Sequence, residues 1–213
     1  MGDRFRNGCN GDMTSECLYD EGEENWPIKL HFGCGGIYLE GYTNIDAQGR
    51  YADVNPIERE ENRTTIHDYY ARLNGTAANL PKRRPNIVDC IADIVTMEYE
   101  PNSVDKIVAI QVLEHISPGR SFAALRHWHT MLKVLHPLVL SIPDMYGTLE
   151  MIKTEPDFSF RHLIGRRGDY LNTHHAWYTH ETLCELLNLF GFKTELLTNF
   201  HFYPAIVVRA IKQ

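Results

Sequence analysis

The sequence lacks a long apolar run and any sign of a secretion signal. None of its apolar stretches approaches the ~18 consecutive residues that a membrane-spanning helix requires. Residues 1–24 are polar and acidic, without the apolar segment of a signal peptide. We therefore expect no membrane span and a cytoplasmic location.

Cysteine is scarce and is not arranged for cross-linking. The number of cysteines is odd, their spacing is irregular and no C-x-x-C pair occurs; they are Cys9, Cys17, Cys34, Cys90 and Cys184. This pattern indicates a reducing compartment, with neither a disulfide framework nor a cysteine-based zinc site.

An excess of positive charge is also missing. The chain has 28 acidic against 21 basic side chains and a formal net charge of -7. Proteins that depend on phosphate contacts are usually basic, so nucleic acid is not an expected partner, although residues 82–84 form one basic loop. Nothing in the sequence indicates a particular oligomeric state.

The 213 residues are enough for a single α/β domain. Residues 1–27 lack apolar periodicity and contain an acidic run. They predict either a loosely packed N-terminal arm or a segment that covers a ligand site. The domain itself is expected over residues 28–213.

Apolar runs alternate with helical patterns along this domain. The predicted strands cover residues 30–32, 42–46, 87–92, 106–111, 137–142, 192–197 and 205–211. Such alternation is typical of a doubly wound, mostly parallel α/β sheet with right-handed crossovers. The last two of the seven strands are joined by a loop without a helix.

Three helices have recognisable signals. A capping-box pattern at Thr65 predicts a helix over residues 65–74. A longer helix opens at residues 117–119, with one apolar stripe formed by Phe122, Leu125, Trp128, Leu132 and Leu135. In the third, Thr179 is the expected N-cap and Gly191 the residue after the C-terminal end.

Chemistry-bearing residues gather where the predicted strands end. The first strand runs into Gly33, Cys34 and Gly35, a turn that lets a ligand approach the backbone. Asp46 ends the second strand, Asp93 follows the third, and residues 111–115 follow the fourth. Ligands of open α/β sheets bind at this edge. The turn lacks the third spaced glycine of the dinucleotide-binding fingerprint.

In these residues the chain resembles the class I S-adenosylmethionine-dependent methyltransferases. It is most similar to a short subgroup with the motifs K-L-x-x-G-C-G, G-[WY]-x-N-x-D and D-x-V-x-x-x-x-x-L-E-H, which match residues 29–35, 41–46 and 105–115. The resemblance implies the seven-stranded methyltransferase fold with an antiparallel last strand. Residues 47–86 are an insertion relative to this subgroup, and the K-P-G-G that relatives carry after the long helix is absent here.

The resemblance also implies a site for S-adenosyl-L-methionine. Gly33, Cys34 and Gly35 would lie against its methionine part, and Asp46 would hold the ribose hydroxyls. Asp93 and Ile94 would bind the adenine, and Gln111 would lie near the sulfonium. His31 occupies a position where many relatives carry an acid, and we include it among the cofactor-binding residues.

The general base is expected among three residues that follow strands or precede the last helix. His115, Asp144 and His175 could each accept a proton. Each also has a purely structural interpretation: a helix-start histidine, a turn aspartate and a packing residue beside Trp177, respectively.

A metal site is not expected, despite the eleven histidines. His174, His175 and His180 cluster in sequence, but no H-x-x-x-H pair places two ligands on one helix face. The aromatic segment 158–178 is instead interpreted as a substrate lid that suits a sugar or a planar acceptor.

Together these features predict methyl transfer to an oxygen or nitrogen of a small-molecule or glycan-like acceptor. Two alternatives remain: a non-catalytic module that binds S-adenosylmethionine, and a Rossmann-type enzyme that uses a nucleotide. A metal-dependent hydrolase is a more distant alternative.

Overall fold

The computed structural model describes residues 27–66, 85–166, 168–199, 201 and 203–213. Residues 1–26 of the predicted N-terminal arm, residues 67–74 of the first predicted helix and the basic loop 82–84 lie outside the described residues. Thr65 and Ile66, where that helix was expected to begin, are not helical.

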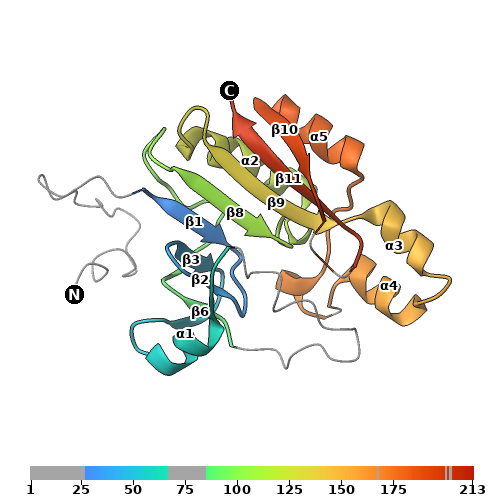
Figure 1. Cartoon of the computed structure of the whole chain (residues 1–213), viewed down its shortest axis with the longest axis horizontal. Helices are drawn as coiled ribbons and strands as arrows, with labels where there is room; N and C mark the ends of the chain where they lie inside the picture. Colours follow the sequence, from blue (N-terminus) through green and yellow to red (C-terminus); the bar gives the residue numbers. More distant parts are fainter. Residues whose placement is uncertain (1–26, 67–84, 167, 200, 202) are drawn as a thin grey trace, which may run out of the picture.

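A seven-stranded sheet forms the centre of the domain (Figure 1). In spatial order it contains β10 (Phe192–Leu197), β11 (Ala205–Lys212), β9 (Pro137–Pro143), β8 (Lys106–Ile110), β1 (Lys29–Phe32), β3 (Thr43–Asp46) and β7 (Cys90–Ile91). Both neighbours of β11 pair with it antiparallel, and the other pairs are parallel. The predicted seven-stranded, mostly parallel sheet with an antiparallel last strand is confirmed.

The third predicted strand is divided at Asp89. β6 (Ile87–Val88) pairs with β4 (Arg50–Tyr51), whereas β7 pairs with β3. Asp89 bonds instead to Asn44: its backbone nitrogen donates to the Asn44 carbonyl at 2.8 Å, and its carboxylate accepts from Asn44 nitrogen at 2.8 Å. A pair of short strands, β2 (Tyr38–Leu39) and β5 (Arg63–Thr64), lies outside the main sheet.

Two helices cover one face of the sheet. The helices of the domain are α1 (Pro56–Asn62), α2 (Pro118–Met131), α3 (Met145–Met151), α4 (Pro156–Ile164) and α5 (His180–Leu189), with 3-10 turns η2 (Leu113–His115) and η3 (Tyr170–Asn172). Buried residues of α2 and α5, such as Leu125 and Leu183, join the main core formed with β1, β8 and β9. The described part of the opposite face has a smaller cluster of Leu39, Val108 and Ile110.

Helix α2 is shorter than the sequence predicts. Leu132 leaves the helix with an extended backbone, and Lys212 Nζ donates to its carbonyl oxygen at 2.9 Å. Leu125, Trp128 and Leu132 are buried, but Phe122 and Leu135 are exposed by 45% and 71%. The stripe prediction was therefore wrong at both ends. Leu135 lies past the end of α2, where the chain turns toward β9, whereas Phe122 lies within α2 and packs against the Phe190 ring but stays partly exposed.

Helix α5 follows its signals. Thr179 forms a capping box with Thr182, and Gly191 has a φ of 83° just past the helix. Both predictions are confirmed. Among the described residues, no helix combines the length and apolar character needed to cross a membrane.

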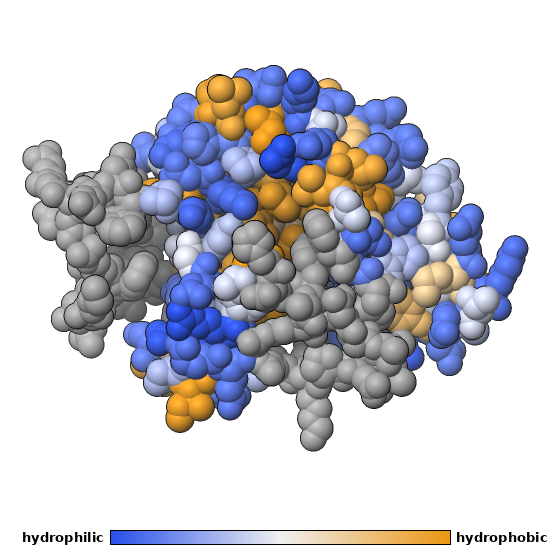
Figure 2. All heavy atoms as spheres, viewed as in Figure 1, coloured by the Kyte–Doolittle hydropathy of each residue, from blue (hydrophilic) through white to orange (hydrophobic). Residues whose placement is uncertain are grey.

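Figure 2 shows the face of the molecule seen in Figure 1, where polar residues surround an apolar area over the middle of the sheet. Ile57 of α1 is a separate exposed apolar residue.

Candidate functional site

A cavity of about 690 Å³ opens where β1, β3, β7 and β8 end. Its wall is formed by Gly33, Cys34, Gly35, Gly36, Ile37, Asp46, Ala47, Gln48, Asn62, Asn86, Ala92, Asp93, Ile94, Val95, Ile110, Gln111, Val112, His115, Ile116, Ser117, Arg120, Tyr170, Leu171, Asn172 and Tyr203. The structure thus brings together eight of the predicted site residues: Gly33, Cys34, Gly35, Asp46, Asp93, Ile94, Gln111 and His115.

The turn after β1 depends on its glycines. Gly33 and Gly35 have φ of 58° and 54°, in the left-handed region that side chains disfavour. A Cβ on Gly33 would lie 2.5 Å from Val112 Cγ2, whereas one on Gly35 would meet no atom within 4 Å. Gly33 therefore permits a close approach of two loops, and Gly35 leaves backbone open to the cavity.

Asp46 joins the ends of β1 and β3. Its Oδ2 accepts a 2.9 Å hydrogen bond from the backbone nitrogen of Gly35, and Oδ1 accepts one of 3.3 Å from Gln48 nitrogen. A carboxylate oxygen can accept more than one hydrogen bond, so Asp46 keeps capacity for a ligand.

Asp93 and Ile94 form the next part of the wall. Asp93 Oδ1 accepts from Val95 nitrogen at 3.0 Å, and Oδ2 pairs with the guanidinium of Arg120. Trp128 Nε1 donates to the Ile94 carbonyl at 2.8 Å. The loop is therefore held from α2 by one exposed ion pair and one core hydrogen bond.

Gln111 has an unusual backbone. Its φ is 56°, and its nitrogen donates to the Ser141 carbonyl at 2.7 Å. Its amide Nε2 donates to Ser141 Oγ at 3.3 Å, and the same hydroxyl lies 2.8 Å from His201 Nε2. Burial lowers the pKa of His201 to about 4, so this ring is neutral near pH 7. Strained non-glycine backbone often occurs at functional sites.

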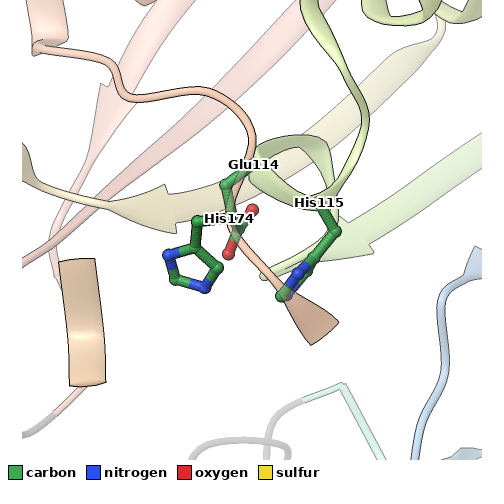
Figure 3. Close-up of side chains that lie close together, drawn as sticks. All are labelled: Glu114, His115 and His174. Atoms are coloured by element: carbon green, nitrogen blue, oxygen red, sulfur yellow. The ribbon is translucent and has the colours of Figure 1, made fainter. Parts of the chain in front are cut away.

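His115 lies beside two other ionisable side chains, those of Glu114 and His174 (Figure 3). The ring centroids of the two histidines are 4.7 Å apart, and the Glu114 side chain extends from η2 next to them. Burial raises the pKa of Glu114 to about 8 and lowers that of His174 to about 4. Burial also lowers the pKa of His115, although the Thr173 carbonyl bonded to its ring opposes this shift.

His31, Asp144 and His175 do not line the cavity. His31 is fully buried, and its Nδ1 donates to Asn44 Oδ1 at 2.8 Å. Asp144 caps α3, where its side chain accepts from Tyr146 nitrogen. His175 Nε2 lies 3.2 Å from the carbonyl oxygen of Tyr170, which is itself a residue of the wall.

Some wall residues were not predicted. Arg120 and Tyr203 come from α2 and from the segment before β11, far from the glycine turn in sequence. Tyr203 stacks on His201 with centroids 4.6 Å apart. The aromatic segment 158–178, which the sequence suggests as a substrate lid, contributes Tyr170, Leu171 and Asn172 to the cavity wall.

No protein-family model and no curated protein matches the sequence. Solved structures do resemble the fold. An S-adenosylmethionine-dependent methyltransferase from Methanosarcina mazei is 16% identical with a TM-score of 0.50, over 89% of this chain and 94% of that one. A candidate S-adenosylmethionine-dependent methyltransferase from Listeria monocytogenes is 14% identical with a TM-score of 0.52, over 89% and 92%.

The YcgJ protein from Bacillus subtilis is 10% identical with a TM-score of 0.50, and the match covers 88% of this chain and 93% of that one. These likenesses concern the fold. The seven-stranded sheet, with its antiparallel β11, is that of the class I methyltransferases.

Proposed function

We propose that the chain is an S-adenosylmethionine-dependent methyltransferase that acts on an oxygen or nitrogen of a small-molecule or glycan-like acceptor. One observation carries this proposal. The glycine turn, Asp46, Asp93 and Gln111 come from four separate strand ends and line one cavity. The fold shared with methyltransferases supports the same assignment.

The residues of the wall fit the parts of this cofactor. Gly35 offers open backbone to the methionine part, and Asp46 offers acceptor capacity to the ribose hydroxyls. Asp93 and Ile94 would border the adenine, with Trp128 holding that loop in place. Arg120 compensates the charge of Asp93, so Asp46 leaves one net negative charge among these three groups, which favours a positively charged ligand over a phosphate.

The bound cofactor would supply a methyl group on a positively charged sulfur. In-line transfer of that methyl group to the acceptor atom would leave the electron pair of the carbon–sulfur bond on sulfur and would require the acceptor to lose a proton. The protein mainly has to align the two partners and provide for that proton. Of the three predicted catalytic residues, His115 is the one that borders the cavity, either as the proton acceptor or as a group that positions it.

Four other residues of the cavity wall are evidence for a small acceptor with a flat or sugar-like surface. Tyr170, Leu171 and Tyr203 place aromatic and apolar side chains at the cavity, and Asn172 adds a polar amide. Pockets of this composition bind small organic molecules, with the polar group fixing orientation.

Isothermal titration with S-adenosylhomocysteine, the demethylated product, tests the proposal. We expect binding by the intact chain and a loss of about tenfold or more in Asp46→Ala, because a charge-assisted hydrogen bond contributes ~1.5–3 kcal/mol. Asp53→Ala is the matched control, since Asp53 is exposed and outside the cavity.

Absence of binding to the intact chain, or equal binding by Asp46→Ala, would contradict the proposal. Binding without turnover on a panel of hydroxyl and amine acceptors would instead favour a non-catalytic binding module. Competition by NAD would favour a nucleotide-using enzyme.

A further inference from the structure

We propose that Glu114, His115 and His174 form a binding site for a divalent transition-metal ion of the zinc class, beside the cavity. The sequence had not predicted a metal site. Glu114 and His115 belong to η2, whereas His174 comes from the connection that follows η3. Only the fold brings the third side chain to the other two (Figure 3).

The spacing of the three side chains suits a bridging ion. One potential ligand atom from each lies within 4.8 Å of the other two. Neither oxygen of Glu114 has a hydrogen-bond partner among the described residues, so the carboxyl group is not bonded to either imidazole. Two nitrogens on one tetrahedral zinc ion, each bonded at about 2.0–2.1 Å, lie roughly 3.4 Å apart. The three side chains would therefore have to draw together by at most about 1.4 Å to bind one ion.

The polar atoms at this place lack compensation. Glu114 has an exposed fraction of 1%, and neither of its buried carboxyl oxygens accepts a hydrogen bond from another described residue. Buried polar groups normally have a partner, because leaving one unpaired costs free energy. A cation bound by the carboxylate would compensate for its burial.

One hydrogen bond orients the His115 side chain, and backbone hydrogen bonds fix the chain at Glu114 and His174. The Thr173 carbonyl accepts from His115 Nδ1 at 3.2 Å, which leaves Nε2 of the neutral ring as the electron-pair donor. Metal-binding histidines commonly donate their other ring nitrogen to a carbonyl in this way. The Glu114 carbonyl accepts from His175 nitrogen at 2.7 Å, and His174 nitrogen donates to the Ile164 carbonyl at 2.9 Å.

The donor set indicates which ion would bind and what it could do. Two imidazoles and one carboxylate suit zinc, and with three protein ligands a fourth position stays free for a bound molecule. Of the three residues, His115 lines the cavity, so an ion bound to it would lie next to the cavity. His115 would then act as a metal ligand, and the acceptor's proton would be made more acidic by the ion.

Titration of the metal-free, untagged full-length chain with Co²⁺ tests this proposal. We expect one equivalent of Co²⁺ to give the visible absorption of a four- or five-coordinate site, and Zn²⁺ to displace it. Glu114→Gln and His174→Gln should each weaken binding by ten-fold or more. His127→Gln is the matched control, because Nε2 of His127 is also buried and has no partner in the described part of the chain, but His127 is not part of the cluster.

Absence of one-equivalent binding by the intact chain, or equal binding by all variants, would overturn the proposal. If Glu114→Gln and His174→Gln fail to fold, ring-nitrogen NMR of the unmodified chain replaces them. The signals of His115 and His174 should then shift with Zn²⁺ while that of His127 does not, and unchanged signals would overturn the proposal. Neither measurement contains S-adenosylmethionine, so both are independent of the proposed methyl transfer.

Discussion

Trp128 Nε1 donates a 2.8 Å hydrogen bond to the carbonyl oxygen of Ile94. Trp128 is fully buried in α2, and its ring lies 5.2 Å from that of Phe32 on β1. The loop that carries Asp93 and Ile94 is therefore fastened to the centre of the core and not only to its exposed ion pair with Arg120.

Trp128→Phe should loosen this loop while leaving an aromatic ring in the core. We expect the free energy of unfolding to fall by about 1–3 kcal/mol, the cost of an unpaired buried carbonyl and a smaller ring. S-adenosylhomocysteine should bind more weakly, because the adenine side of the cavity is no longer fixed. Urea unfolding and calorimetry measure the two effects.

Trp177→Phe is the control for Trp128→Phe. Trp177 also donates to a backbone carbonyl, that of Leu163 at 2.6 Å, but its side chain is half exposed. Water can replace this partner, so a smaller loss of stability is expected. Equal losses in the free energy of unfolding of the two variants would mean that the burial of Trp128 does not determine the size of its effect on stability.

Gly33→Ala and Gly35→Ala should separate a clash from backbone strain. Both residues have similar positive φ, which costs about 1–2 kcal/mol for a residue with a Cβ. Only the added Cβ at Gly33 meets Val112, at 2.5 Å. We therefore expect Gly33→Ala to lose at least 1 kcal/mol more in urea unfolding than Gly35→Ala, since overpacking typically costs about 1–3 kcal/mol. Equal losses would contradict the close approach.

Gln111→Gly and Gln111→Ala should have different stabilities although both lack the amide. Gln111 has a φ of 56°, which glycine adopts more readily than alanine. The glycine variant should be more stable by about 1 kcal/mol. Both should bind S-adenosylhomocysteine more weakly if Gln111 borders the sulfur. A glycine variant that binds like the unchanged chain would remove Gln111 from the proposed site.

His31 should make stability depend on pH. Burial lowers its pKa from 6.5 to about 4, although the hydrogen bond to Asn44 opposes this shift. Between pH 6.5 and pH 4, the His31 ring is therefore protonated in the unfolded chain but neutral in the folded chain. The contribution of His31 is complete above pH 6.5 and is lost as pH falls toward 4, by about 3 kcal/mol.

His31→Gln tests this dependence, because glutamine can still donate to Asn44 Oδ1 but does not titrate. The free energy of unfolding of the variant should fall less between pH 7 and pH 4 than that of the unchanged chain. Other buried histidines, such as His201, contribute equally to both proteins and cancel in the comparison. Parallel pH curves would refute the assignment to His31.

Local pattern was sufficient to predict the sheet but not its edges. The continuous apolar run of β8 indicates a strand buried on both faces, and the structure confirms it. The division at Asp89 depends on a bond to Asn44, which is 45 residues away. The early end of α2 depends on the path toward β9, and Lys212 joins it from the far end of the chain. Contacts of this kind leave no periodic signal.

The candidate site follows the same rule. Asp46, Asp93 and Gln111 could be placed together because parallel strands end at a common edge. His31 belongs to β1, whose residues Leu30, His31 and Phe32 are all buried, so both faces of this strand are covered. No feature of one sequence separates a packed histidine from a ligand at this position. Arg120, Tyr203 and His174 reach the site through a helix and long connections, so their positions depend on the whole fold.

The close approach of Gly33 to Val112 also restricts the order in which these two positions can change. A substitution that adds a Cβ at position 33 meets a branched side chain that fills the space, whereas a smaller residue at position 112 opens that space first. The two positions, which follow β1 and β8, are therefore expected to change together. In a directed-evolution experiment, variants at 33 should survive mainly in lineages that already carry a reduced side chain at 112.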